Sequence, residues 1–140
     1  MEPRASTEYI VIHCSATKPN MDIGLQEIRK WHVNENGWRD VGYHYIVRRN
    51  REIELGRSNR DTGAHAAGYN HKSISMCMVG GMAEDNSAEN NFTDKQWLAT
   101  LDLVKQLKVD YPDADVIGHN EISKKECPSF DVKKWKEDNL

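Results

Sequence analysis

The chain has 140 residues, 38% of them hydrophobic, and a formal charge of −3, which is typical of one globular domain with a core of its own. No apolar run is long enough to span a bilayer. The slightly acidic charge gives no support for direct binding to nucleic acid, which usually needs a basic surface. We therefore expect one domain over residues 1–140, a monomer that does not bind membranes.

The first eight residues, MEPRASTE, are polar and lack the apolar stretch of a secretory signal. We expect residues 1–8 to be flexible, and the protein to be synthesised in the cytoplasm without an export signal. The three cysteines, Cys14, Cys77 and Cys127, are odd in number and widely spaced. This pattern disfavours a disulfide framework and indicates free thiols, at least one of which could be a metal ligand.

The first half of the chain predicts three strands and a helix. Residues 8–14, EYIVIHC, form a β-branched apolar run that predicts a buried strand ending near His13. Residues 25–37 carry leucine, isoleucine and tryptophan at helical spacing and end at a glycine, which predicts a helix. Residues 42–50 and 51–55 predict two strands joined as a hairpin.

The second half predicts two more strands and two helices. Residues 73–81 form a nearly continuous apolar run, typical of a strand covered on both faces. Thr93 and Gln96 have the spacing of a capping box and predict the start of a long helix. Its expected apolar stripe consists of Leu98, Leu101, Val104 and Leu107. Residues 114–119 predict the last strand, and residues 131–139 a short amphipathic helix.

Strands and helices alternate along the chain, with one hairpin. The expected fold class is therefore α/β, a single domain with a central mixed β-sheet flanked by helices. His13 and His119 both fall at the ends of predicted strands, where sites on such sheets usually lie. The stretch that follows, GHNEISKKECPSF, then places Lys125 and Cys127 in one short polar loop.

Two imidazoles and a thiolate are ligands that zinc accepts, and a catalytic zinc site has three protein ligands and one open position. His13, His119 and Cys127 would form such a set if residues 120–126 fold back, and closing a loop of that length costs little. The alternative is a solvated loop with a half-buried cysteine, which the absence of a C-x-x-C spacing favours. The residues alone leave both interpretations open.

Six segments, IVIHCSATKPN, DVGYHYIVRRN, HAAGYNHKSIS, MVGG, NFTDKQW and CPSFD, occur in order along nearly the whole chain. Together they resemble the type-2 N-acetylmuramoyl-L-alanine amidases, a family that includes phage endolysins, cell-wall recycling amidases and peptidoglycan recognition proteins. The resemblance implies the fold of that family. It also implies one catalytic Zn2+ ion held by His13, His119 and Cys127, with Tyr43 and Lys125 as catalytic residues that do not bind the metal.

By the same resemblance, His65 and Asn70 are assigned as contacts of the substrate. Relatives usually have a glycine where this chain has Ser75, near the floor of the groove, and the sequence does not show what this change does. His44 follows Tyr43 on a predicted strand, so its side chain should point to the opposite face. We expect His44 to be a hydrogen-bonded residue of the core.

The other histidines and cysteines have ordinary interpretations. His32 on a predicted helix and His71 in a polar loop are expected to be solvated. Cys14 and Cys77 lie inside apolar strands and are expected to be inert core thiols. Alternation along the strand points Cys14 away from the face of His13, so Cys14 is not expected to be a fourth ligand.

The resemblance implies a zinc-dependent amidase that cleaves peptidoglycan between the lactoyl group of N-acetylmuramic acid and L-alanine. A phage endolysin would be made in the host cytoplasm and reach the wall in the periplasm once the membrane is opened. A wall-recycling amidase and a non-catalytic peptidoglycan-binding module are the alternatives; the presence of Cys127, Tyr43 and Lys125 argues against the second. One phage relative also inhibits its RNA polymerase, so a phage RNA polymerase is a second candidate partner.

Overall fold

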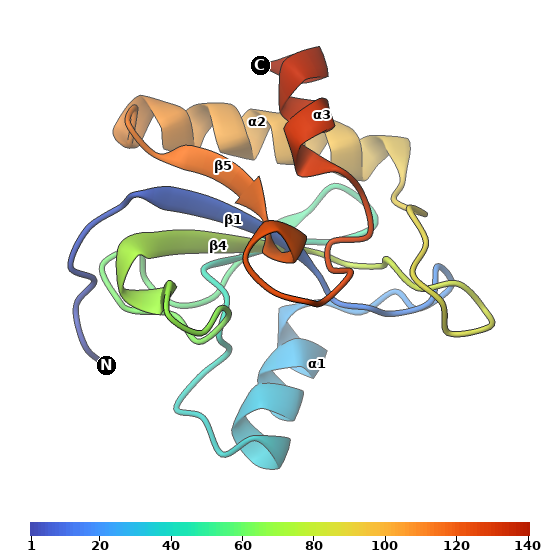
Figure 1. The fold of residues 1–140 in the computed structure, drawn as a ribbon. Helices are drawn as coiled ribbons and strands as arrows, with labels where there is room; N and C mark the ends of the chain where they lie inside the picture. The colour runs from blue at the N-terminus through green and yellow to red at the C-terminus, as the bar shows by residue number, and fades with distance from the viewer.

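The computed structural model describes residues 1–140, which form one mixed five-stranded sheet with the strand order β3-β2-β4-β1-β5 (Figure 1). The strands are β1 (Tyr9–Cys14), β2 (Tyr45–Val47), β3 (Ile53–Leu55), β4 (Ser73–Met78) and β5 (Asp115–Gly118). β1 runs parallel to both β4 and β5, and β2 runs parallel to β4, whereas β3 pairs with β2 as an antiparallel hairpin. The predicted fold class is therefore confirmed.

Three helices cover the two faces of this sheet. They are α1 (Leu25–Lys30), α2 (Asp94–Asp110) and α3 (Val132–Asn139). α2 and α3 lie over one face and α1 lies under the other (Figure 1). α1 continues into a π-helical turn, Trp31–Glu35. No helix is both long enough and apolar enough to cross a membrane.

The sheet divides the core into two layers. Ile10 and Ile12 of β1 face α2 and α3, together with Met76 of β4. Cys77 of β4 belongs instead to the smaller cluster beside α1. Because side chains alternate along a strand, His13 projects to the α1 side of the sheet. All six residues of β4 are buried, which confirms the prediction of a strand covered on both faces.

α2 begins with the predicted capping box. The Oγ1 atom of Thr93 accepts a hydrogen bond from the backbone N–H of Gln96. In return, the Oε1 atom of Gln96 accepts a hydrogen bond from the backbone N–H of Thr93. The side-chain amide of Gln96 also donates to the carbonyl oxygens of Val47 and Val79. The buried positions of α2 are Gln96, Ala99, Thr100, Leu103, Val104 and Leu107.

The predicted stripe of α2 was therefore partly wrong. Leu98 is 53% exposed, whereas Val104 and Leu107 are buried as expected. The reason is the buried Gln96, whose bonds to the sheet fix the rotation of the helix about its axis. With Gln96 facing the sheet, residues three, four, seven and eleven positions later also face it, and Leu98 does not.

The N-terminal segment, residues 1–8, was expected to be flexible, and in the structure it is hydrogen-bonded to the rest of the chain. The backbone N–H of Thr62 donates to the carbonyl of Glu2 at 2.8 Å, and that of Glu8 donates to the carbonyl of Lys72 at 2.8 Å. The segment thus follows the loop that connects β3 to β4. That loop also carries His65, which lies at the candidate site.

Candidate metal centre and active site

Strand pairing brings two histidines together. β1 and β5 are parallel neighbours, and Ile12 pairs with Gly118. The next residue after each of these two is a histidine, so His13 and His119 lie side by side at the same end of the sheet, with ring centroids 4.4 Å apart. The prediction that both histidines stand at neighbouring strand ends is confirmed.

The following loop folds back and brings in a thiol. The Sγ atom of Cys127 lies 3.7 Å from the Nδ1 atom of His13 and accepts from the backbone N–H of Cys14 at 3.2 Å. One nitrogen each of His13 and His119 and the Cys127 sulfur all lie within 4.8 Å of one another. Two imidazoles and a thiol that converge on one point fit a tetrahedral zinc ion with one open position. We call these three residues the metal group.

Burial prepares the two histidines as ligands. The pKa of His13 is well below its ordinary value, first because the ring is buried and then because of the nearby histidines. Burial and the cation of Lys125 also lower the pKa of His119. Both rings are thus neutral and have a lone pair to offer. The neighbouring Cys14 thiol and burial raise the pKa of Cys127, so its thiolate form needs a cation beside it.

A chain of hydrogen bonds orients His13. Its Nε2 atom lies 2.9 Å from the Nδ1 atom of His65, whose Nε2 atom lies 3.0 Å from the Oγ atom of Ser73. The Ser73 hydroxyl donates to the carbonyl of Tyr69, so it accepts from the Nε2–H of His65. His65 Nδ1 is then the acceptor for the Nε2–H of His13. This pattern leaves the lone pair on His13 Nδ1, the atom that faces Cys127.

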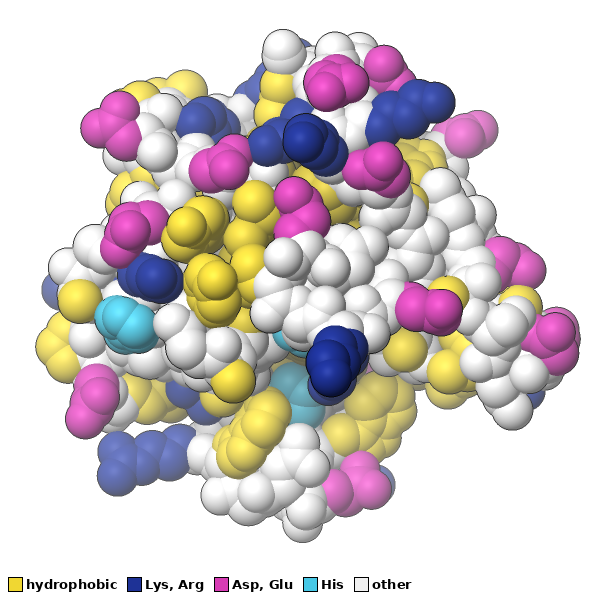
Figure 2. Space-filling view, viewed as in Figure 1, with side chains coloured by type: hydrophobic (Ala, Val, Ile, Leu, Met, Phe, Trp, Pro, Cys, Tyr) yellow, Lys and Arg dark blue, Asp and Glu magenta, His cyan; other side chains and the backbone are white.

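A hollow of about 310 Å3 opens onto the metal group; we call it the site hollow. Tyr43 and Lys125 both line it, and the Tyr43 ring centroid lies 5.1 Å from that of His13. Burial raises the pKa of Tyr43 well above its ordinary value, so the phenol keeps its proton. Lys125 is exposed at the rim. Figure 2 shows histidine recessed beside a basic side chain near the middle of this face.

His44 and Ser75 lie behind the site. His44 is 1% exposed, as predicted for a core residue; its Nε2–H donates to the carbonyl of Asp61, and its Nδ1 accepts from the backbone N–H of Ser75. Burial lowers the pKa of His44 to about 4. The Ser75 hydroxyl accepts from the backbone N–H of His44 at 3.3 Å. Ser75 therefore contacts His44 and does not line the site hollow. Tyr43 was predicted to lie within a strand, but β2 begins only at Tyr45, so Tyr43 lies just before it.

Asn70, predicted to contact the substrate, holds the loop beside the site. The Oδ1 atom of Asn70 accepts from the backbone N–H groups of His65 and Ala66, each at 2.9 Å, and thereby holds their loop. Asn70 does not line the site hollow, and its contact with substrate stays a prediction.

The expectation that His32 is solvated was wrong. Its Nδ1 atom accepts a hydrogen bond from the backbone N–H of Gly42, and the residue lines the site hollow.

Sequence reasoning missed the placement of His32 and the role of Ser73. His32 lies four residues after the buried Ile28, a spacing that places it on the inner face of the helix and could have indicated its position. Ser73 is the first residue of β4 and lies in the segment HAAGYNHKSIS, but no role was predicted for it. His71 is exposed, as expected, and Cys14 and Cys77 are buried. Cys14 packs in the core on the α2 side, outside the metal group.

The fold is shared by solved amidases and by peptidoglycan recognition proteins. The solved amidase LysC from Clostridium intestinale URNW superposes with a TM-score of 0.78 at 25% identity, covering 95% of this chain and 85% of that one. Residues 3–130 match the family model described as N-acetylmuramoyl-L-alanine amidase. The chain therefore belongs to the N-acetylmuramoyl-L-alanine amidase family.

Two phage proteins are similar over nearly the whole chain. The endolysin of Enterobacteria phage T3 is 46% identical over 138 residues, which cover 99% of this chain and 91% of that protein. The endolysin of Escherichia phage T7 is 46% identical over 136 residues, which cover 97% of this chain and 89% of that protein. The resemblance found in the sequence motifs is thus confirmed.

Proposed function

We propose that this protein is a zinc-dependent N-acetylmuramoyl-L-alanine amidase that serves as a phage endolysin. It hydrolyses the amide between the lactoyl group of N-acetylmuramic acid and the L-alanine of the stem peptide. One observation carries the proposal: the ligand atoms of His13, His119 and Cys127 converge within 4.8 Å in a chain that matches this family over residues 3–130. The identity to two phage endolysins supports the lytic role, in which the enzyme reaches the wall after the membrane is opened.

The metal group would hold the zinc ion. When bound, zinc acts as a Lewis acid that polarises a carbonyl oxygen and lowers the pKa of water. The chain's own contribution is to keep the imidazoles of His13 and His119 neutral by burial. The hydrogen bond from His13 to His65 fixes the direction of one of them. These are the conditions under which imidazole is a strong ligand.

Tyr43 and Lys125 supply the remaining polar groups of the site hollow. The Lys125 ammonium stabilises the negative charge that develops on the oxygen of the attacked carbonyl. Tyr43 keeps its phenolic proton because its pKa is raised, so it acts as a hydrogen-bond donor rather than as a base. The departing amine of L-alanine needs a proton, and these two residues are the candidate donors.

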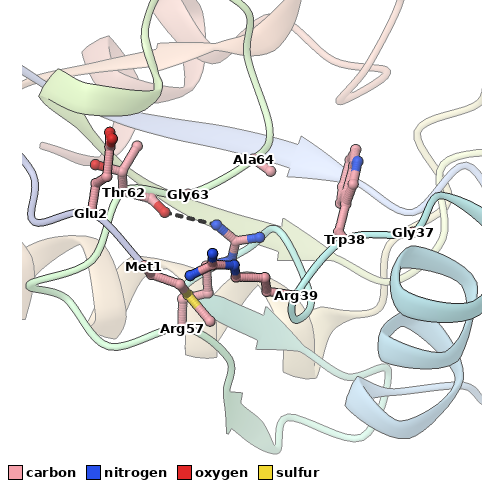
Figure 3. Close-up of a pocket in the computed structure, with 9 residues that line it drawn as sticks. All are labelled: Met1, Glu2, Gly37, Trp38, Arg39, Arg57, Thr62, Gly63 and Ala64. Atoms are coloured by element: carbon pink, nitrogen blue, oxygen red, sulfur yellow. Dashed lines mark hydrogen bonds between the residues drawn. The ribbon is translucent and has the colours of Figure 1, made fainter.

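The stem peptide has a route away from the metal group. A second hollow, of about 570 Å3, contains Arg39 and Arg57 and shares Trp38 and Ala64 with the site hollow; we call it the arginine hollow (Figure 3). Stem peptides carry free carboxylates, which the exposed guanidinium of Arg39 attracts; the guanidinium of Arg57 donates to the carbonyls of Val41 and Thr62. The peptide side of the substrate therefore lies in the site hollow and extends toward the arginine hollow. His65 and Asn70 are proposed substrate contacts on the resemblance alone.

The test is digestion of purified Gram-negative sacculi with and without a chelator, followed by mass spectrometry of the soluble products. Release of free stem peptides that begin with L-alanine, abolished by the chelator and restored by zinc, is the expected result. Soluble fragments in which the peptide is still joined to muramic acid would contradict the assigned bond. Unchanged release in the presence of the chelator would contradict the metal requirement.

Inhibition of a phage RNA polymerase is a second hypothesis, which rests on the resemblance to phage relatives. Its test is transcription by the polymerase of the same phage in the presence of the Cys127→Ser protein, whose folding is checked beforehand. Inhibition that rises with dose and weakens when residues 2–7 are deleted would support it. Absence of inhibition by both this variant and the wild type would leave the amidase activity alone.

A further inference from the structure

Two of the three cysteines lie next to each other at the end of the sheet. The Sγ atom of Cys127 accepts a hydrogen bond from the backbone N–H of Cys14 at 3.2 Å and lies 3.8 Å from the carbonyl oxygen of Cys14. The two thiol groups also contact each other directly, and both side chains pack in the cluster on the α2 side of the sheet. A member of the metal group is therefore paired with a second thiol that none of the steps above uses.

The Cys127 sulfur has a possible partner on each side. On one side it lies 3.7 Å from the Nδ1 atom of His13, in the direction of the metal group. On the other side it meets the backbone and thiol of Cys14. A metal ion needs the thiolate form of Cys127, whereas a sulfur bonded to a second sulfur at about 2.05 Å has no thiolate charge to offer. Binding of a metal and bonding to Cys14 thus exclude each other.

The two thiols differ in their access to solvent. Cys127 is partly exposed, whereas Cys14 is 5% exposed. Both residues border the site hollow and also a third hollow, of about 210 Å3, which lies between residues 81–88 and the loop that carries Cys127. A small reagent therefore reaches Cys127 first. Cys77 is fully buried in the cluster beside α1, on the opposite side of the sheet from these two thiols.

We propose that Cys14 and Cys127 form a disulfide when no metal is bound, and that this disulfide excludes zinc. The proposal rests on the zinc site of the proposed function. The oxidant is a small-molecule or protein disulfide. The Cys127 thiolate attacks one sulfur of the oxidant and displaces a thiolate, which leaves a mixed disulfide on Cys127. The Cys14 thiolate then attacks the Cys127 sulfur and displaces the second thiolate. Two electrons pass from the cysteines to the oxidant, and the two thiol protons end on the two thiols that are released.

This chemistry depends on the compartment. The cytoplasm keeps thiols reduced, whereas the bacterial periplasm forms disulfides. An enzyme that binds zinc in the host cytoplasm has Cys127 committed as a ligand when it reaches the wall. An enzyme that arrives there without metal is cross-linked and cannot acquire zinc. Zinc must therefore be bound before the membrane is opened.

The test treats metal-free wild type, prepared with a chelator, with oxidised glutathione. Free thiols should fall from three per chain to one, because two of them are consumed. The intact mass should fall by two hydrogen atoms, and peptide mapping should show Cys14 linked to Cys127. Zinc binding, measured by competition with a chromophoric chelator, should be lost and should return after reduction with dithiothreitol. Zinc-loaded protein should keep all three thiols under the same oxidation.

Two variants identify the reacting thiols. Cys14→Ala leaves the metal group intact and should bind zinc, but its metal-free form should stop at the mixed disulfide on Cys127 and gain the mass of one attached glutathione. Cys77→Ala is the matched control, because it removes the thiol on the other side of the sheet, and it should cross-link like the wild type.

Three outcomes in the wild type, which need no variant to fold, would each overturn the proposal. They are three free thiols after oxidation of the metal-free protein, a cross-link that involves Cys77, and undiminished zinc binding by the cross-linked protein. The proposed function is tested separately by the reduced protein. If the reduced wild type does not bind zinc, the proposed metal site is wrong, whereas a missing cross-link in protein that does bind zinc overturns this inference alone.

Discussion

The Nε2 atom of His13 lies 2.9 Å from the Nδ1 atom of His65, so one buried histidine orients another at the metal group. Resemblance to the family assigns His65 to substrate binding, and the geometry adds a contact with a metal ligand. Burial lowers the pKa of His65 to about 3, so the ring is neutral and can accept from His13. The hydroxyl oxygen of Ser73 accepts a hydrogen bond from the Nε2 atom of His65 and so holds the His65 ring in place.

Replacing His65 by alanine should weaken zinc binding by roughly 10–100-fold, the usual effect of removing a group that orients a ligand. The measurement is a competition titration against a chromophoric chelator. His71→Ala is the matched control, because His71 is exposed and touches no member of the metal group. If His65→Ala binds zinc like the wild type and only its KM for substrate rises, His65 is a substrate contact and not a positioning residue.

Cys127→Ser, His13→Ala and His119→Ala should each abolish both stoichiometric zinc and hydrolysis. Each variant removes one of three ligands, and zinc bound by two side chains is held weakly. Zinc is measured by atomic absorption on dialysed protein, and hydrolysis by the clearing of sacculi. Cys14→Ala should keep its zinc, because Cys14 lies outside the metal group. An active Cys127→Ser protein that contains no zinc would eliminate the metal mechanism.

Lys125→Met and Tyr43→Phe should bind zinc and melt near the wild-type temperature but lose hydrolysis by roughly 10²-fold or more, the scale for removing a group that stabilises the transition state. Lys125 is exposed, so its truncation leaves the core intact. Lys124→Met is the matched control, since Lys124 is also exposed and lines none of the three hollows. Loss of zinc with normal turnover at excess zinc would show that the assigned role is wrong.

Much of the architecture could be predicted from local patterns. The apolar run that becomes β1, the turn between β2 and β3, and the Thr93–Gln96 cap each depend on a few adjacent residues. The positions of His13 and His119 could also be predicted, because the apolar pattern of each strand shows where that strand ends. The grouping of these residues with Cys127 came from the family resemblance, since spacing alone left a solvated loop open.

What could not be predicted depends on contacts between distant segments. Leu98 is exposed because Gln96 bonds to the backbone of β2 and to Val79, just after β4, which no helical pattern reveals. Ser73 acts through His65, eight residues away. In both cases a hydrogen bond from a polar side chain, rather than apolar periodicity, sets the outcome.

The pH dependence of stability tests the buried state of His44. Its pKa is about 4 in the folded protein and about 6.5 when unfolded. Between these values the unfolded chain takes up a proton that the folded chain does not, so the stabilisation is complete above about pH 6.5 and is lost as the pH falls. The loss approaches about 1.4 kcal/mol per pH unit for one such group.

His44→Asn removes this titration and keeps an acceptor near the position of Nδ1, while the hydrogen bond from Nε2 to the Asp61 carbonyl is lost in the variant. The free energy of unfolding by urea, measured on chelator-treated protein from about pH 7 to about pH 5, should therefore fall less steeply in His44→Asn than in the wild type. The pKa of the neighbouring His65 is lowered first by burial, which the variant keeps, and only secondarily by the charge of His44. His71→Asn, at an exposed position, should keep the wild-type slope. Equal slopes for His44→Asn and the wild type would mean that His44 is protonated in the folded protein, against the bond that its Nδ1 accepts from Ser75.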